Sequence, residues 1–468
     1  MGRQGFESLI SQFRIFSKET GFMQKKVSGR SWIVIILFGL FGQIAWSVEN
    51  MYFNLFLFNE IGGTTTDISV MVAASAITAT AATLLMGALS DRIGYRRMFI
   101  SVGYIVWGLA TASFAFISRG NVARFAPAAS VVATAVTLVI IMDCIMSYIG
   151  STANDAAFNA WVTEFTDTSN RGKVEGVLSV FPLLAMVIVS GVSGILIESI
   201  GYPLFFASLG GLVTLAGFLG IFIIPRSATP PSRKESYFSG LIYGFLPSVI
   251  RKNKSLYLSL LSMCIFGISF QVMMPYLLIY FEHYLRMDAL TYSIVLVAAI
   301  FTSSVTGIVL GRLVDRFGRK KFGILSVAVF TAGLIMLYLV RDVPLVGAAG
   351  TIMLCGYLLI SIVINTSVRD NTPRDKVGLF QGVRMIFFVL IPMTIGPAIG
   401  NAVIQRSNIT FANEFNEITK IPTPEIFLVA AIVAVLIIIP MNLVLKSEKN
   451  RPFDSQKKNA RLPETPEI

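Results

Sequence analysis

The sequence predicts an all-α membrane protein built from two similar halves of six transmembrane helices each. The chain has 468 residues, of which 54% are hydrophobic and only 14% are charged, against about 25% charged in ordinary soluble domains. Apolar stretches of roughly twenty residues, long enough to cross a bilayer as a helix, recur along the whole chain. A short basic segment also occurs twice, once in each half.

The repeated basic segment predicts the two-fold organisation. Gly87–Arg97 reads GALSDRIGYRR, and Gly311–Lys321 reads GRLVDRFGRKK, 224 residues later. Each copy ends one apolar stretch and begins the next, so each is predicted to be a tight turn between two helices. Beyond the third helix an offset of 206 residues aligns Asn159 with Asn365. The offsets differ by 18 residues, which predicts an insertion around residues 119–136 that lengthens the fourth helix or forms a loop.

Twelve spans follow from the apolar stretches. A lead (residues 1–31) precedes the first half (32–224), and a basic linker (225–255) separates it from the second half (256–445), which is followed by a charged tail (446–468). The predicted spans are 32–58, 68–90, 97–118, 138–164, 174–198 and 203–224, then 256–281, 289–311, 321–340, 345–368, 378–404 and 424–445.

The formal charge of +12 indicates membrane topology rather than nucleic-acid binding. If the N-terminus is cytoplasmic, most of the 38 Lys and Arg residues lie on the cytoplasmic side, as the positive-inside rule requires. This predicts a multi-pass protein of the plasma or inner membrane with both termini in the cytoplasm. The three cysteines lie far apart within apolar stretches and offer neither a metal site nor a disulfide framework.

Twelve spans, a central linker and a doubled GxLxDRxG pattern with basic residues after each copy resemble the major facilitator superfamily. The resemblance covers residues 31–445 and implies a transporter working by alternating access. Within that superfamily, Ala45–Gly62 is similar to the first helix of the glycoside and sugar–cation symporters. The fifth helix carries SGVSG at Ser190–Gly194, without the proline of the glycine motif that many drug–proton antiporters have there.

The resemblance also implies a conformational latch at the basic turns, which holds the halves together on the cytoplasmic side. Glu164, at the inner end of the fourth helix, is the expected partner of Arg92 or Arg96. Alternatively, these charges only set the topology. The predicted latch residues are Gly87, Asp91, Arg92, Gly94, Arg96, Glu164, Gly311, Asp315, Arg316, Gly318 and Arg319.

Ionisable residues inside the spans are the best candidates for coupling. A charged group in a span is costly, by about 2.5–3.5 kcal/mol on insertion scales, and marks a pathway or proton relay. Asp155 in the fourth helix is the first candidate and Glu49 in the first helix the second, for binding a proton or a sodium ion. A structural hydrogen bond or ion pair is the alternative for both. Asp143 is predicted near the outer end of its helix, outside the hydrocarbon.

Amide, aromatic and guanidinium groups near these carboxylates predict a cavity for a hydroxylated solute. Any single amide is better explained as an interhelical hydrogen bond. Arg384 either binds an anionic part of the substrate or closes the inner gate against Asp155. The cavity candidates are Trp46, Asn50, Asn54, Asn159, Gln271, Tyr276, Asn365, Gln381 and Arg384.

The sequence therefore predicts a transporter, not an enzyme, that moves a small organic solute, preferably a sugar, with protons. Proton-coupled efflux of drugs or metabolites, facilitated diffusion, and a membrane sensor or scaffold without transport are the alternatives. No cofactor other than a coupling ion is expected. The predicted partners are the substrate and the lipid bilayer, and the protein is expected to be a monomer.

Overall fold

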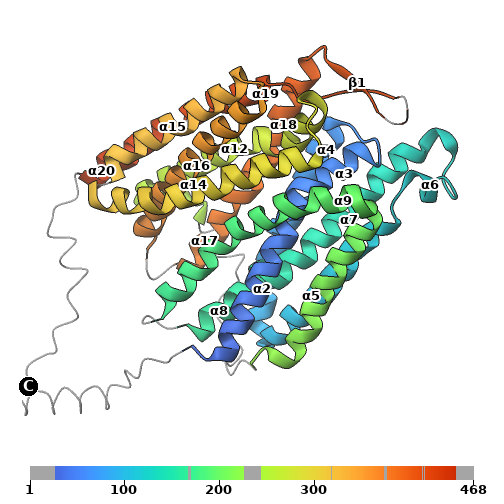
Figure 1. Cartoon of the computed structure of the whole chain (residues 1–468). Helices are drawn as coiled ribbons and strands as arrows, with labels where there is room; N and C mark the ends of the chain where they lie inside the picture. Colours follow the sequence, from blue (N-terminus) through green and yellow to red (C-terminus); the bar gives the residue numbers. More distant parts are fainter. Residues whose placement is uncertain are drawn as a thin grey trace, which may run out of the picture.

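The computed structural model describes residues 27–166, 170–225, 244–317, 319–373, 377–413, 415 and 417–449. The elements of the first half are α2 (Gly29–Val48), η1 (Glu49–Phe53), α3 (Asn54–Asn59), α4 (Thr65–Ile93), α5 (Arg96–Ser113), η2 (Phe114–Phe116), α6 (Arg119–Val122), η3 (Ala128–Ser130), α7 (Val131–Gly150), η4 (Ser151–Phe158), α8 (Asn159–Phe165) and α9 (Arg171–Ile223). They form one bundle of long helices (Figure 1).

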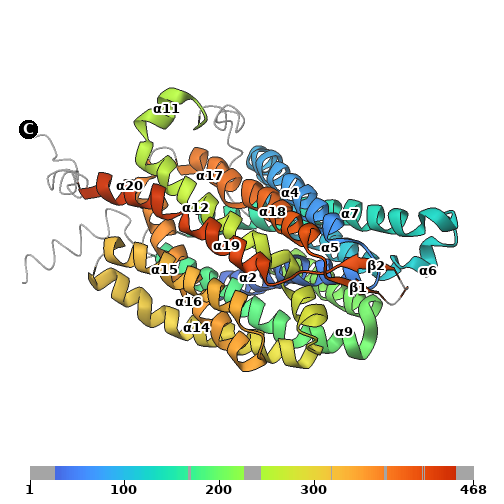
Figure 2. The ribbon, with the colours of Figure 1, turned by 90° about the horizontal axis from the view of Figure 1, so that it is seen from above.

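The second half packs beside the first as a bundle of similar helices (Figures 1 and 2). Its elements are α11 (Pro247–Lys252), α12 (Lys254–Met273), η5 (Met274–Tyr276), α13 (Leu277–Ile279), η6 (Tyr280–Tyr284), α14 (Ala289–Phe317), α15 (Arg319–Leu339), α16 (Val343–Asn371), α17 (Val377–Met385), η8 (Ile386–Leu390), α18 (Ile391–Arg406), β1 (Thr410–Ala412), β2 (Ile418–Lys420), α19 (Glu425–Val435) and α20 (Ile438–Lys449).

Eleven helical segments in the described part of the chain are long and apolar enough to cross a membrane. One of them, Lys173–Ile223, has 51 residues and would be far longer than the roughly 30 Å hydrocarbon layer at about 1.5 Å per residue. It is broken at Gly201, whose φ of 74° and ψ of 164° are not helical. This segment therefore supplies two spans, and the twelve predicted spans are accounted for.

The basic turn after the second span is tight because of one glycine. Gly94 adopts φ 74° and ends α4, and its N–H bonds to the carbonyl of Ser90. Only glycine enters this left-handed region without strain, so α5 begins two residues later. We call the end of the bundle that carries this turn the basic end, and the opposite end, with β1 and β2, the hairpin end.

The insertion after the third span has two parts. Residues 119–130 contain α6 and η3 with a turn between them, and α7 then begins at Val131, seven residues earlier than predicted. Both of the predicted outcomes therefore occur: the fourth helix is longer and a loop precedes it. In the second half, β1 and β2 pair antiparallel between α18 and α19, with Thr410 opposite Lys420, which the sequence did not predict.

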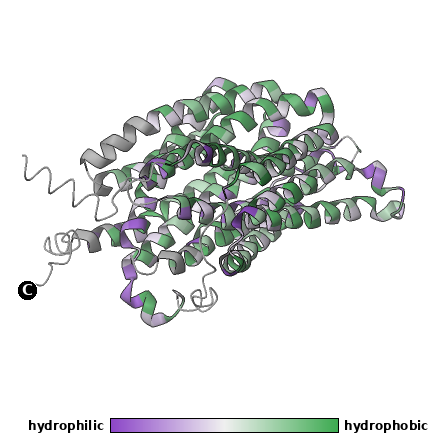
Figure 3. Cartoon of the chain, turned by 90° about the horizontal axis from the view of Figure 1, so that it is seen from below, coloured by the Kyte–Doolittle hydropathy of each residue, from purple (hydrophilic) through white to green (hydrophobic). Residues whose placement is uncertain are grey.

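Apolar side chains cover the flanks of the bundle, as a lipid-facing surface requires. Figure 3 shows hydrophobic residues along the outward sides of the helices. Leu204, Phe222 and Leu339 expose between 60% and 71% of their surface. Inside each half, large aromatic residues such as Trp107 and Phe330 are fully buried.

The two halves are joined by hydrogen bonds at the hairpin end. Thr65 Oγ1 donates to Asn401 Oδ1 over 2.9 Å, and Gln405 Nε2 donates to Thr65 Oγ1 over 3.1 Å. Asn59 Nδ2 donates to Glu282 Oε1 over 2.7 Å. These bonds link α3 and α4 of the first half to η6 and α18 of the second, so the structure is closed at this end.

Candidate functional site

The two predicted coupling carboxylates, Glu49 and Asp155, lie in π-helical segments. Glu49 opens η1, and Asp155 lies within η4. A π-helix bonds each N–H to the carbonyl five residues back, is rare, and occurs often at functional sites. Around η1, the carbonyl of Trp46 in α2 accepts from the side-chain amide of Asn50 (2.7 Å), and the carbonyl of Asn50 accepts from that of Asn54 in α3 (2.9 Å). Those two amides therefore bond to carbonyls of their own helix, and not between helices as the sequence favoured for any single amide.

Glu49 is buried and only half satisfied. Its side chain is 8% exposed, and its Oε1 accepts from Ser147 Oγ of α7 over 2.8 Å. Its Oε2 is buried without a hydrogen-bond partner among the described residues. A buried carboxylate oxygen left without a partner is costly, so this position is suited to binding a cation.

Asp143 lies beside Glu49, which corrects the sequence prediction. The expected start of the fourth helix at residue 138 placed Asp143 near the outer end. Because α7 begins at Val131, Asp143 lies inside the span, four residues before Ser147 and on the same helix face. It is 1% exposed, and its Oδ1 has no hydrogen-bond partner among the described residues. Its carboxylate is close enough to that of Glu49 for the two negative charges to repel each other.

Asp155 completes a group of three acids. Its charge also acts on Glu49, and its side chain is partly exposed rather than buried. We call Glu49, Asp143 and Asp155 the carboxylate cluster. The sequence signal for Asp143 was an acidic residue within a long apolar helix, and the misplaced helix start hid it.

Arg384 is directed to Asn365 rather than to Asp155. Its Nη2 donates to Asn365 Oδ1 over 3.0 Å, and its guanidinium lies 5.8 Å from the ring centroid of Phe388. Asn365 itself donates to the carbonyl of Ser361 over 2.8 Å. The structure thus brings two predicted cavity residues together, both in the second half.

The remaining cavity candidates are dispersed. Tyr276 is fully buried, and its hydroxyl donates to the carbonyl of Pro397 over 2.8 Å. Trp46 packs on Trp107 with ring centroids 5.2 Å apart. Gln271 packs against Gly396 of α18, and Asn159 is exposed and donates to the carbonyl of Asp155. The side chain of Gln381 lies outside the described residues.

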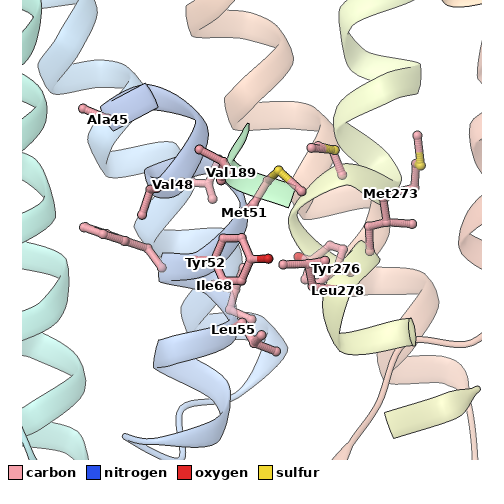
Figure 4. Close-up of a cluster of buried hydrophobic side chains, with 14 of the residues drawn as sticks. Ala45, Val48, Met51, Tyr52, Leu55, Ile68, Val189, Met273, Tyr276 and Leu278 are labelled. Carbon is pink, nitrogen blue, oxygen red and sulfur yellow. The ribbon is translucent and has the colours of Figure 1, made fainter. Parts of the chain in front are cut away.

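An apolar cavity of about 40 Å³ lies where the halves meet. Met51 of η1 and Met186 of α9 line it from the first half, and residues of α12 to α16 line it from the second, including Met273, Met274 and Met353. Figure 4 shows Met51 and Tyr52 facing Met273 and Tyr276 across this contact. Methionine is flexible and polarizable and suits surfaces that accept varied apolar ligands.

The predicted latch is described in part. Arg96 forms an ion pair with Glu164, as expected, and its Nη1 donates to Ser90 Oγ over 3.3 Å. This pair joins the start of α5 to the end of α8, within the first half. Gly94 closes the turn, as described above, and a Cβ added to Gly87 would lie 3.9 Å from the Cβ of Ala156 in η4. Arg92 is exposed in the last turn of α4.

The rest of the predicted latch cannot be placed. Gly318 lies outside the described residues. The same is true of the side chains of Asp91, Asp315, Arg316 and Arg319, and of the surroundings of Gly311.

Comparison with known proteins supports the fold. The family model for the Major Facilitator Superfamily matches residues 32–284 and again 259–467. An uncharacterized MFS-type transporter of Escherichia coli (strain K12), YdeE, is 26% identical over 139 residues, which are 29% of this chain and only 34% of that protein.

Two solved structures are similar over almost the whole chain. The nucleoside transporter NupG has a TM-score of 0.65 at 13% identity, covering 90% of this chain and 100% of its own. A bacterial homolog of the human lysosomal transporter Spinster, in an inward-facing and unoccupied conformation, has a TM-score of 0.62 at 14% identity, covering 89% and 95%. The family match shows that the chain belongs to the Major Facilitator Superfamily and is a multi-pass membrane protein with that fold.

Proposed function

We propose that this protein is a secondary active transporter that couples the movement of a small organic solute to protons. The carboxylate cluster carries the proposal. Glu49 and Asp143 each hold a buried oxygen without a partner among the described residues, and Asp155 lies within electrostatic reach of Glu49. Like charges repel strongly where water is excluded, so the cluster favours a bound cation, for which a proton or a sodium ion is the candidate.

The location of the cluster suits coupling. Glu49 belongs to the first span and Asp143 to the fourth, so Ser147 and the two acids join two helices of one half. On η1, Met51 lines the apolar cavity while Glu49, two residues earlier, faces α7. One short π-helical segment therefore connects a cation site to the contact between the halves.

The lining of the cavity favours an amphipathic solute as the second candidate substrate class. Its sixteen lining residues are apolar or glycine, whereas a sugar needs several hydrogen-bonding groups placed around it. The amides predicted to hold a sugar instead bind helix carbonyls at Asn50, Asn54 and Asn159. A sugar remains the prediction from sequence, and the substrate panel below decides between the two.

The test is uptake by purified protein in proteoliposomes under an imposed pH gradient or an imposed sodium gradient. The substrate panel holds sugars, nucleosides and amphipathic organic cations. Glu49→Gln and Asp143→Asn are compared with Asp342→Asn, which removes an exposed acid between α15 and α16. We expect gradient-driven uptake to be lost in the first two variants and kept in the third.

Each alternative has its own outcome. Uptake driven by a sodium gradient but not by a pH gradient would show that the coupling ion is sodium and not the proton. Counterflow without any concentrative uptake would indicate facilitated diffusion and remove the coupling role of the cluster. Ligand binding without counterflow would indicate a sensor or scaffold and overturn the proposal.

A further inference from the structure

The insertion in the first half and the hairpin in the second meet at one ion pair. Arg119 of α6 binds Glu417, which lies between β1 and β2: Nη1 is 3.2 Å from Oε1 and Nη2 is 2.6 Å from Oε2. A two-point arginine–carboxylate pair fixes orientation as well as distance. Figures 1 and 2 show α6 and the hairpin at the same end of the molecule.

Each partner is held in place by its own half. Arg119 Nε donates to the carbonyl of Ile61, in the turn before α4, over 2.7 Å. Glu417 Oε2 accepts from Asn413 Nδ2 over 3.0 Å, and Asn413 Oδ1 accepts from the N–H of Glu417 over 2.8 Å. The two side chains are therefore positioned before they meet, which lowers the entropy cost of the contact.

A glycine and an aromatic ring complete the receptor for Arg119. Gly62 has φ 76°, and a Cβ at this position would lie 1.7 Å from Arg119 Nη2. The guanidinium carbon lies 3.5 Å from the ring centroid of Phe415, in cation–π geometry. Gly62 belongs to the first half and Phe415 to the second, so the guanidinium is enclosed by both.

Strand β1 covers a second junction between the halves. The ring of Phe411 lies 4.4 Å from that of His283, centroid to centroid. His283 Nε2 is 2.8 Å from Asn59 Oδ1, and Asn59 belongs to α3 of the first half. The hairpin thus touches the first half directly through Glu417 and covers the α3–η6 contact through Phe411.

We propose that α6 and the β1–β2 hairpin form a clasp that holds the hairpin end closed and that opens in every transport cycle. This rests on the proposed function, because a secondary transporter that works by alternating access, as the family resemblance implies, needs a second state in which this end is open. The clasp joins segments that have no counterpart in the other half. It therefore adds contacts to the state closed at the hairpin end.

The test measures opening directly. A reporter thiol is introduced by Ser69→Cys, since Ser69 is 8% exposed in α4 and lies beside Tyr276 of the second half. Cys144, Cys264 and Cys355 are replaced by serine, and a membrane-impermeant maleimide is applied from the hairpin end. We expect Glu417→Gln to increase the labelling rate about threefold to tenfold and Asp342→Asn to leave it unchanged.

A second measurement tests the clasp in case the Glu417→Gln protein does not fold. Arg119→Cys with Glu417→Cys, bridged by a short bifunctional thiol reagent, is expected to stop both labelling and transport until the bridge is cleaved. Unchanged labelling in folded Glu417→Gln, or full transport in the bridged protein, would overturn the clasp. Labelling that responds as expected without any gradient-driven uptake would instead reject the proposed function and leave the clasp intact.

Discussion

At the scale of single residues, the three acids of the carboxylate cluster differ in how far they are buried. From the sequence, Asp155 is the first candidate and Glu49 the second, as ionisable residues inside the fourth and first predicted spans. The structure buries Asp143 to 1% exposure and leaves Asp155 partly exposed. The sequence placed Glu49 and Asp155 inside their spans but placed Asp143 near the end of its helix. The helix start was predicted seven residues too late, so Asp143 was expected about 10 Å nearer the helix end than it is.

Asp143→Asn is expected to reduce pH-gradient-driven transport more than Asp155→Asn does. Asparagine keeps the shape of Asp143 but cannot bind and release a proton. It also carries no negative charge, so the electrostatic repulsion between Asp143 and Glu49 is lost. Initial uptake rates at a fixed gradient give the comparison, with counterflow at zero gradient as the control for folding and substrate binding. Equal losses in the two variants would contradict the ranking by burial.

Tyr104→Phe is expected to destabilise the protein by about 1–3 kcal/mol, the cost of stranding buried polar partners. The Tyr104 hydroxyl donates to the carbonyl of Phe38 and accepts from Asn154 Nδ2, each over 2.6 Å. Thermal unfolding in detergent measures the effect. Tyr148→Phe, at a tyrosine that is 36% exposed, is the matched control and should change little.

At the scale of elements, small residues decide how closely helices approach. Gly333 of α15 and Gly356 of α16 face each other's helix. A Cβ on Gly333 would lie 2.4 Å from the backbone of Met353, and one on Gly356 would lie 2.3 Å from the backbone N of Phe330. Close backbone contact of this kind is typical of packing in membranes. The hydropathy pattern predicted the spans, but it could not predict which glycines lie where two helices cross.

Gly356→Ala is therefore expected to lower stability by about 1–3 kcal/mol, the usual cost of overpacking. Gly350→Ala on the same helix is the control, because its Cβ would meet the Cβ of Ala299 at an ordinary 3.9 Å. Unfolding temperatures of the two variants in the same detergent decide the matter. A Gly356→Ala protein as stable as the control would show that α15 and α16 separate without cost.

At the scale of the whole molecule, the sequence predicted the twelve spans and the two halves but not the contact between them. Hydropathy and the duplicated turn report on segments, whereas the docking of α6 onto the hairpin joins residues almost 300 positions apart. Neither α6 nor the hairpin has the length or apolar pattern of a span. Their contact becomes visible only when the two halves are placed beside each other.

Acid is expected to loosen the hairpin end. Hydrogen bonds from Arg119, and to a lesser degree from Asn413, lower the pKa of Glu417 below its ordinary value of 4.5, although partial burial opposes them. A lowered pKa means that the stabilisation is present above the ordinary value and is lost as the pH falls through the lowered one. The thiolate fraction of any cysteine falls with pH, so the labelling rate of the Ser69→Cys thiol is divided by the rate for the unfolded protein at the same pH. This ratio should be constant from pH 7 to pH 5 and rise below.

In the Glu417→Gln protein this acid-dependent rise should be absent, because no carboxylate remains to be protonated. A rise of equal size in both proteins would assign the effect to another group. The ion pair is partly exposed, with Glu417 at 46%, so high salt should weaken it as well.

The insertion of 18 residues has a consequence for the energetics of the cycle. The contacts between the inserted chain and the hairpin exist only in the end state that is closed at the hairpin end. They favour that state over the other, and each 1.4 kcal/mol between the two states is about a tenfold bias in population. The molecule then rests in one state, and the slow step of turnover is the departure from it, which substrate and coupling ion must promote by binding the other state more tightly.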